Sequence, residues 1–388
     1  MGDLMANFKM LTPHDELQLD DLSKSPWLLN KICPYFTMFP IQYPVQILND
    51  IEEATVFDPF CGRGTTLFAA RMFGFNTYGI DNNPIAVAVS KAKLTDTTID
   101  DIMEALARAL DYDCKPEIPS SEFWQKAYNA EVLARICKIR YYLLNHDNPG
   151  ECALRGIILG ALHGSRTKNP DNASYLGNQM PRTYAPKPAY SLKFWNNLGL
   201  IPDNVDIKKI VKKRAIRYYE SNISVVPNQV IYGDSRIADC FRQLPKVSVI
   251  ITSPPYYGMQ TYYTDQWIRN WFLGGPDNPT NALNHQFCHS SPQAFACELS
   301  KVWRNCATIS QEKTKMFVRY GGISSRKVDP TEIFVNSIAL TDGIWRILNI
   351  KDAGNSLKGK RQAVQMLSTT DKKSIPISEF DVEMILNA

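Results

Sequence analysis

The sequence lacks several patterns that mark common classes of protein. Its nine cysteines form no CxxC pair, and its five histidines show no ligand spacing, so we expect no metal site. No segment reaches 18 apolar residues, and the first residues lack the basic-then-apolar pattern of a signal peptide. We therefore predict a cytoplasmic protein with reduced thiols and no membrane partner.

Net charge is also small, at +4 for 388 residues, so any surface that binds a polyanion must be local. The chain is 44% hydrophobic and has no low-complexity tract, which indicates a globular protein. Its length exceeds that of most single hydrophobic cores. This favours one large domain with an insertion, or two domains.

Strand and helix patterns alternate near the start of the chain. Residues 54–57 are typical of a buried strand, and 65–73 of a helix that Gly74 can end. Residues 76–81 predict a second strand, and Pro84 can open a second helix. Such β-α-β-α alternation implies a parallel sheet with right-handed crossovers.

The alternation stops and then returns. Residues 95–222 show mostly helical patterns, with a proline- and asparagine-rich connection. From residue 223 strands reappear, at 228–235, 249–252, 315–322 and 343–350, with helices at 237–244, 265–273 and 291–309. The simplest division is one α/β domain, residues 1–94 and 223–388, interrupted by a mostly helical insertion, residues 95–222.

A glycine turn, Gly62-Arg63-Gly64, lies between the first strand and its helix. Glycines let a ligand approach the backbone, and the helix start offers free N–H groups. Asp81 ends the second strand, 19 residues after Gly62, where a carboxylate can accept hydrogen bonds from ribose hydroxyls. By itself the turn fits nucleotide binding and a purely structural role equally well. The missing third glycine of GxGxxG argues against a dinucleotide.

A second unusual segment follows the apolar run at 249–252. Ser253-Pro254-Pro255-Tyr256 cannot continue a central strand, because proline offers no N–H to the ladder. The segment could be only a rigid turn that caps the strand. It could also hold polar and aromatic groups at the strand's carboxyl end, where ligands bind in α/β proteins.

Four segments in this order resemble the DNA amino-methyltransferases, which methylate N4 of cytosine or N6 of adenine. They are DPFCGRGTT (58–66), GID (79–81), GDS (233–235) and TSPPY (252–256). Arg63 stands where a small residue is commoner. The resemblance implies a Rossmann-like class I methyltransferase sheet with helices on both faces, and S-adenosyl-L-methionine as cofactor. TSPPY is most typical of the N4-cytosine members.

The resemblance also assigns roles to single residues. Asp234 would contact the adenine amine of the cofactor, although an aspartate there could equally cap a helix. A segment before the glycine turn, YFTMFPIQYPVQIL, looks like the family motif that packs on the cofactor. The residues implied to bind cofactor are Phe39, Asp58, Pro59, Phe60, Cys61, Gly62, Gly64, Thr65, Asp81, Asn82, Asp234 and Ser235.

The chemistry explains the catalytic residue types. An exocyclic amine is a poor nucleophile, because its lone pair is delocalised into the ring. The Ser253 hydroxyl and the Pro254 carbonyl can accept its N–H groups and localise that lone pair. Pro255 keeps the loop rigid, and Tyr256 can stack on a flipped base. Attack at carbon 5 of cytosine needs a cysteine, usually in a Pro-Cys dipeptide, which this chain lacks.

In the family the variable insertion is the target-recognition region, so the resemblance implies that residues 95–222 recognise the DNA target. The insertion is locally basic. Residues 151–220 contain twelve Lys or Arg and five Asp or Glu, an excess of seven. In residues 206–219, Ile207, Ile210, Val211 and Tyr218 can share one helix face and leave the basic residues on the other. Such a face suits DNA phosphates, although charge runs are often only solvated. The residues predicted to bind DNA are Arg166, Lys168, Arg182, Lys187, Lys208, Lys209, Lys212, Lys213 and Arg214.

These patterns predict a site-specific DNA methyltransferase that acts on cytosine N4 in double-stranded DNA, in restriction-modification or host defence. The resemblance also makes a cognate restriction endonuclease a candidate partner. Adenine N6 is the nearest alternative target. A guanine-N2 RNA methyltransferase is a different class, but such enzymes usually carry Asp or Asn where Ser253 stands. A catalytically dead homologue that only binds DNA is a further alternative.

Overall fold

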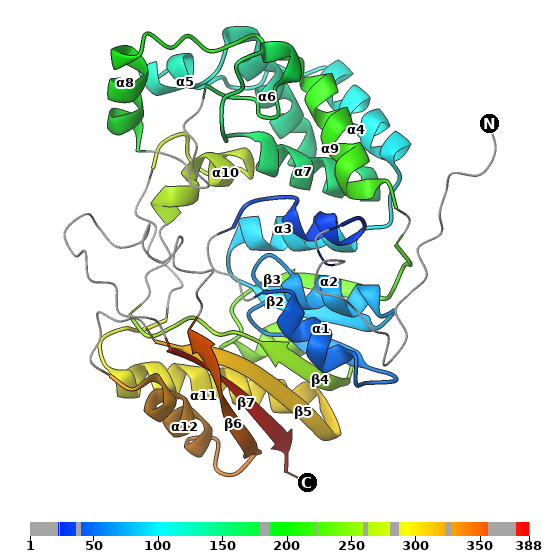
Figure 1. Ribbon diagram of the computed structural model, residues 1–388, viewed down its shortest axis with the longest axis vertical. Coiled ribbons are helices and arrows are strands. Elements are labelled where there is room, and N and C mark those ends of the chain that lie inside the picture. Colours follow the sequence, from blue (N-terminus) through cyan, green and yellow to red (C-terminus); the bar gives the residue numbers. More distant parts are fainter. Residues whose placement is uncertain are drawn as a thin grey trace.

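The computed structural model (Figure 1) describes residues 22, 24–35, 40–178, 187–221, 223–258, 263–279, 287–322, 328–355 and 378–387. Its strands form one seven-stranded sheet in the order β3-β2-β1-β4-β5-β7-β6. Strands β1 to β5 pair in parallel, and β7 runs antiparallel to both β5 and β6. The strands are β1 (Thr55–Asp58), β2 (Asn76–Asp81), β3 (Asn228–Tyr232), β4 (Val247–Thr252), β5 (Ser310–Gly321), β6 (Trp345–Asn355) and β7 (Ser378–Leu386).

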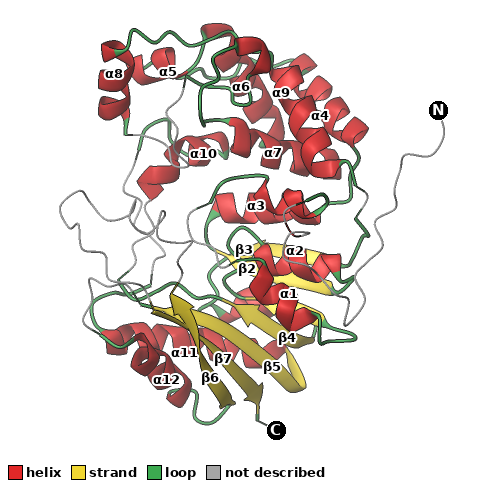
Figure 2. Ribbon diagram, viewed as in Figure 1, coloured by secondary structure: helices red, strands yellow, loops and turns green. Residues whose placement is uncertain are grey.

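Helices cover both faces of this sheet (Figure 2), as expected for a Rossmann-like class I methyltransferase fold. Strand β4 shows why. Val249 and Ile251 belong to one hydrophobic core and Ile250 to the other, which Val247 joins across a register shift at the start of the strand. Successive side chains of a strand face opposite sides, so a doubly covered strand must be apolar throughout. The first core includes α1 (Gln42–Leu48), α2 (Thr65–Met72) and α3 (Pro84–Leu94), and the second includes α11 (Pro292–Ile309) and α12 (Pro330–Ala339).

Between α3 and β3 the described chain is helical, as the sequence predicted. Asn83 caps α3, and Thr98 and Asp101 form a capping box on the next helix. Helix α10 comes from the later half of the chain but packs among these helices (Figure 1). The helices are α4 (Ile99–Asp111), α5 (Glu122–Ala127), α6 (Ala130–Leu143), α7 (Pro149–Ala161), α8 (Pro188–Asn197), α9 (Ile207–Tyr219) and α10 (Trp267–Phe272), with the short turns η3 (Pro170–Asn172) and η5 (Tyr263–Gln266). The exact domain boundaries stay a prediction.

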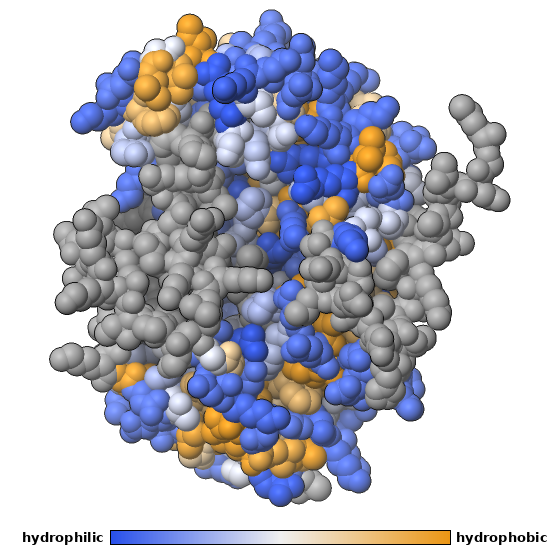
Figure 3. Space-filling model, in the orientation of Figure 1, coloured by the Kyte–Doolittle hydropathy of each residue, from blue (hydrophilic) through white to orange (hydrophobic). Residues whose placement is uncertain are grey.

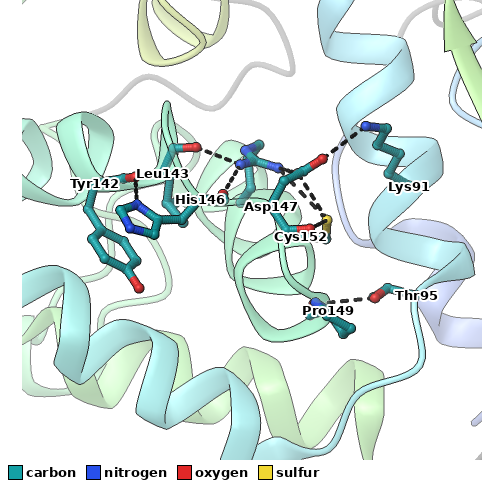
Figure 4. Close-up of polar contacts among 9 residues, drawn as sticks. Lys91, Thr95, Tyr142, Leu143, His146, Asp147, Pro149 and Cys152 are labelled. Atoms are coloured by element: carbon teal, nitrogen blue, oxygen red, sulfur yellow. Dashed lines mark hydrogen bonds and ion pairs between the residues drawn. The ribbon is translucent and has the colours of Figure 1, made fainter.

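Helix α7 fixes this helical region to the sheet domain. A side chain at Gly156 would collide with Ala92 of α3, so glycine permits the close approach of the two helices. Polar contacts support the same junction (Figure 4). The Lys91 ammonium lies 3.0 Å from Asp147 Oδ2, and the Cys152 thiol donates to Asp147 Oδ1 at 3.1 Å. The helical region is therefore held against the helix that follows Asp81.

The structure differs from the sequence prediction at four elements. Residues 237–244 form only a single 3-10 turn, η4 (Ala238–Phe241), because Phe241 packs inward while Ile237 stays 53% exposed and Pro245 follows. Helix α8 begins at the end of the proline- and asparagine-rich connection and was not predicted. Helix α12 and strand β7 were not predicted either. Among the described residues, no helix is both long and apolar enough to cross a membrane.

Candidate active site at the carboxyl edge of the sheet

The glycine turn and the proline-rich segment meet at one edge of the sheet. Asp81, Asp58 and Thr252 end the neighbouring parallel strands β2, β1 and β4. Strand β7 ends at the lower side of Figure 1 near the C-terminus, so the parallel strands end at the opposite side, beneath α10. Open α/β sheets bind ligands at this edge.

The two glycines of the turn have left-handed backbone conformations, with φ of 52° at Gly62 and 72° at Gly64. A Cβ atom at Gly64 would lie 2.6 Å from Ser90 Oγ, so this glycine allows the turn to pack on α3. At Gly62 the nearest atom would be the Phe60 carbonyl oxygen at 3.9 Å. The Gly62 position therefore faces open space, where a ligand can approach the backbone.

Arg63, the residue that departs from the family pattern, points away from this opening. It is 6% exposed, and its guanidinium donates to the carbonyl oxygens of Asn30 and Cys33. The buried Lys93 donates to Asn30 Oδ1 at 2.8 Å and to the Arg63 carbonyl oxygen. Arg63 thus ties the glycine turn to η2 (Trp27–Lys31) and leaves the ligand side clear.

Asp58 is almost completely buried, at 1% exposed. Its Oδ1 accepts hydrogen bonds from the Phe60 amide at 3.0 Å and from Thr252 Oγ1 at 2.6 Å. Its Oδ2 is buried and has no hydrogen-bond partner among the described residues. Burial raises the pKa of this carboxyl to about 7, and the Thr252 and Phe60 hydrogen bonds oppose that rise.

Asp81 holds the glycine turn from the second strand. Its Oδ2 accepts the Gly62 amide at 2.8 Å, and its Oδ1 accepts the Asn83 amide at 2.8 Å. Burial raises the pKa of Asp81 to about 6, against the effect of these two hydrogen bonds. Each carboxylate oxygen has a second lone pair, so Asp81 can still accept ribose hydroxyls. Asn82, the next residue, is partly exposed at the same edge.

S-adenosyl-L-methionine carries an ammonium and a sulfonium, and the residues present fit it. An open glycine backbone adjoins two carboxyls of raised pKa, one with an unpartnered oxygen. Pro59, Phe60, Cys61 and Thr65 build the surrounding turn, and Phe60 packs on Phe287 with ring centroids 5.7 Å apart. Phe39 lies outside the described residues.

The polar side chains of the GDS segment bond to neighbouring parts of the protein. Asp234 Oδ1 accepts the Arg236 amide at 2.9 Å, and its Oδ2 pairs with the Arg236 guanidinium at 2.5 Å. It therefore closes a turn of its own backbone, close to the capping role that the sequence left open. Ser235 Oγ donates to the Pro59 carbonyl at 2.5 Å and fixes the glycine turn. A contact between Asp234 and adenine stays a prediction.

Ser253, Pro254, Pro255 and Tyr256 leave the end of β4 directly beside this turn. The Tyr256 hydroxyl donates to Glu379 Oε1 at 3.1 Å. Burial and the Glu379 charge hold the pKa of Tyr256 well above its usual range, whereas a hydrogen bond from Ser253 lowers it. The Tyr256 ring also packs edge-on against Tyr320, with centroids 5.4 Å apart. The aromatic side chain is thus fixed at both its ring and its hydroxyl.

Glu379 is not among the residues predicted for the site, because strand β7 was not predicted. The alternation of Phe380, Val382 and Met384, all buried, was the available signal. Two residues beyond Glu379, Asp381 binds the Arg319 guanidinium through two hydrogen bonds of 2.7 Å. The two acidic residues are two positions apart on β7 and so project from the same face, Glu379 to Tyr256 and Asp381 to Arg319, which lies over the Tyr43 ring.

The predicted basic face is present on α9, with one correction. Ile207, Ile210, Val211 and Tyr218 are buried as predicted, and Lys208, Lys209, Lys212 and Lys213 are exposed. Arg214 is not part of that face. It is 8% exposed, donates to the Ser174 carbonyl at 2.8 and 3.0 Å, and lies over the Tyr175 ring. Its position on the helix turns it toward the packed side.

The other residues predicted to bind DNA differ in their exposure and in their ion pairs. Arg166 forms two hydrogen bonds with Asp203, of 2.8 and 2.9 Å, which neutralise much of its charge locally. Lys168 and Lys187 are exposed. Arg182 lies outside the described residues. In the described part of the chain, no group of His, Cys, Asp and Glu side chains is arranged to hold a metal ion.

The sheet and glycine turn define the class of fold, that of the Rossmann-like class I methyltransferases. No family model matches the chain. The chain is 23% identical over 270 residues to the type II methyltransferase M.MvaI of Kocuria varians, a match that covers 59% of this chain and 53% of that protein. The match thus spans about half the length of that relative.

Two solved structures are among those to which the chain is similar. The rRNA methyltransferase aviRa of Streptomyces viridochromogenes is 11% identical with a TM-score of 0.36, and covers 96% of this chain and 94% of its own. TehB of Haemophilus influenzae is 8% identical with a TM-score of 0.36, and covers 94% of this chain and 67% of its own. Both TM-scores are below 0.5, so neither likeness bears on the substrate.

Proposed function

We propose that this protein is a site-specific DNA methyltransferase that modifies the N4 amine of cytosine. One observation carries the proposal: Thr252 Oγ1 donates to Asp58 Oδ1 at 2.6 Å. The first residue of TSPPY is thereby bonded to the first residue of DPFCGRGTT. A methyl donor held at the glycine turn would lie next to Ser253 and Pro254. The partial match to a type II methyltransferase supports the same function.

The proposed cofactor, S-adenosyl-L-methionine, supplies an electrophilic methyl group on sulfur. Asp58 and Asp81 would hold its positive charge and its ribose hydroxyls, and the open backbone at Gly62 would allow it to approach. Ser235 keeps the turn in place through the Pro59 carbonyl. These residues prepare the site before the cofactor arrives, which limits the ordering cost of binding.

In the proposed reaction, Ser253 and the Pro254 carbonyl accept the N–H groups of the target amine and localise its lone pair. The two prolines fix the positions of these acceptors. Tyr256 would stack on a base flipped out of the duplex. Its contacts with Glu379 and Tyr320 hold the ring before the base enters.

DNA is the proposed partner because part of the basic excess of residues 151–220 lies on one exposed helix face. Lys208, Lys209, Lys212 and Lys213 are exposed on α9 and suit phosphate contacts. Figure 1 places α9 beside α4, away from the strand ends beneath α10. Contacts made by α9 would therefore fall on the duplex that flanks the target base. A cognate restriction endonuclease and a cytoplasmic location remain predictions from the sequence.

The deciding experiment identifies the methylated nucleoside that the protein produces. Plasmid DNA from cells that express the protein should contain N4-methylcytosine by nucleoside mass spectrometry, at one sequence by single-molecule sequencing. Ser253→Ala should remove the mark, while unchanged thermal unfolding shows that this variant is folded. N6-methyladenine instead would contradict the choice of base and keep the mechanism. Methylated RNA with unmodified DNA would contradict the substrate class.

A further inference from the structure

Helix α8 has an exposed polar face, none of whose residues was predicted from the sequence to bind DNA. Tyr190, Lys193 and Asn197 are spaced i, i+3, i+7 and are all exposed, with Tyr190 51% exposed. The opposite side is fixed by Ser191 and Trp195, which are fully buried. From residue 187 to 201 the sequence has two lysines and no acidic residue. The face is therefore positive, rich in hydrogen-bonding groups and firmly supported.

An aromatic chain connects this helix to the segment after the catalytic residues. The Trp195 ring packs on Phe123 of α5 with centroids 5.5 Å apart, and Phe123 packs on Trp267 of α10 at 4.8 Å. Trp124, also in α5, donates to the Asp277 carbonyl at 2.9 Å. Helix α8 is thus held to the part of the chain that continues from TSPPY.

The start of α8 lies near the same segment. Burial raises the pKa of Asp265 in η5, and the positive charge of Lys187, which precedes α8, partly opposes that rise. Figure 1 shows α8 on the same side of the helical region as α10, with α10 between it and the sheet, whereas α9 lies on the other side. Of the two basic helices, α8 is therefore the one on the side of α10, which follows the catalytic segment in the sequence.

We propose that α8 reads the DNA sequence around the target base, with Tyr190, Lys193 and Asn197 in a groove of the duplex. This rests on the proposed function. An asparagine amide can pair with adenine, and a lysine with guanine or phosphate. An exposed helix face that enters a groove is a common geometry for base-edge contacts. The lysines of α9, on the other side of the helical region, would contact phosphates without regard to sequence.

Two apolar side chains extend the same surface. Leu198 and Ile201 follow α8 and are 58% and 73% exposed. Figure 3 shows a hydrophobic patch among hydrophilic residues at the end of the molecule where α8 lies. Apolar groups beside polar ones suit contacts with thymine methyl groups in the major groove.

The test compares two duplexes by fluorescence anisotropy: one with the site identified by sequencing, and one with that site scrambled. Asn197→Ala and Lys193→Ala should each weaken binding to the first duplex about tenfold and leave the second nearly unchanged. The matched control, Lys208→Ala with Lys212→Ala in α9, should weaken both duplexes equally. Sequencing of DNA methylated by the α8 variants should show additional, related sites.

Two outcomes would overturn the inference and can be told apart. If wild-type protein methylates DNA but the α8 variants keep the full ratio of specific to non-specific affinity, α8 does not read sequence and the proposed function stands. If wild-type protein methylates no duplex DNA, the proposed function fails, and the role of α8 fails with it. The substituted side chains are exposed, so the variants should keep the wild-type unfolding temperature.

Discussion

Thr252 at the end of β4 donates its hydroxyl to the buried Asp58 at the end of β1, across 194 positions of sequence. This bond joins the candidate catalytic segment to the candidate cofactor turn. It also supplies one of the few donors available to a carboxyl that is 1% exposed. The relation makes the two motifs one structural unit.

We expect Thr252→Val to remove this donor and keep the side-chain shape. A buried acceptor that loses its donor costs about 1–3 kcal/mol of unfolding free energy, and cofactor affinity should fall as Asp58 moves. Thr77→Val is a matched control, because the buried Thr77 hydroxyl in β2 has no hydrogen-bond partner among the described residues. Urea unfolding and calorimetry measure both effects. Equal behaviour of the two variants would remove the Thr252 bond from the site.

Asp81→Ala should lower the affinity for S-adenosyl-L-methionine. Loss of charge-assisted hydrogen bonds costs roughly 1.5–3 kcal/mol, or about ten- to a hundredfold in affinity. The variant also frees the Gly62 amide that Asp81 now binds. Titration calorimetry on the purified protein gives the dissociation constant directly. A wild-type constant in the variant would exclude Asp81 from cofactor binding.

Stability of the ligand-free protein should fall as pH rises from about 4 to 7. Burial raises the pKa of Asp58 to about 7 and of Asp81 to about 6, above the ordinary values near 4 in the unfolded chain. In that window the folded state binds more protons than the unfolded state, so the free energy of unfolding decreases with pH. Asp58→Asn should reduce the dependence of the unfolding free energy on pH in the upper part of this pH range.

Cofactor affinity should show the opposite trend. A cationic ligand favours the ionised carboxylates, so its affinity should increase between about pH 5.5 and 7.5. Calorimetry at several pH values, in buffers of different ionisation enthalpy, would also report the protons released on binding. A flat pH profile would mean that neither carboxyl titrates with the ligand.

The contact between Tyr256 and Glu379 can be tested by a double-mutant cycle. Tyr256→Phe keeps the ring and removes the hydroxyl, and Glu379→Gln removes the charge. Because the hydroxyl donates to the carboxylate at 3.1 Å, the two changes should couple by about 0.5–3 kcal/mol in unfolding free energy. Each single substitution should slow methyl transfer. The double variant should be no slower than the slower of the two single variants.

Glu383→Gln is the control on the same strand. Glu383 pairs with Lys315 at 3.0 Å, away from Tyr256. It should show no coupling with Tyr256→Phe and no effect on turnover. Additive effects of Tyr256→Phe and Glu379→Gln would mean that the carboxylate does not act through the hydroxyl.

The lysines of α9 should set the salt dependence of DNA binding. Each phosphate contact adds about 0.9 to the slope of log affinity against log salt. Replacing Lys208, Lys209, Lys212 and Lys213 by alanine should therefore flatten that slope, whereas replacing them by arginine should preserve it. If wild type, the alanine variant and the arginine variant all have the same slope, the lysines of α9 are only solvated and do not contact DNA.

Local pattern was enough for the elements that position the site. Residues 54–57 and 249–252 are mostly apolar runs, and residues 76–81 (NTYGID) lie between the helix end at Gly74 and the next helix start at Pro84, so each strand and its end could be predicted. The same holds for α9, whose apolar spacing assigned its buried face correctly. In these segments the spacing of apolar residues matches the repeat of the strand or helix that forms.

Tertiary structure decided what the pattern could not. Glu379 reaches Tyr256 only because β7 inserts between β5 and β6, a pairing between distant segments. Arg63 and Arg214 look like surface cations in the sequence, but carbonyl oxygens of distant residues bind them in the interior. The sequence by itself determined the strands, the turn and the catalytic segment, because these follow from neighbouring residues. The partners of single polar side chains depend on which distant backbone lies within 3 Å, and only the folded chain fixes that distance.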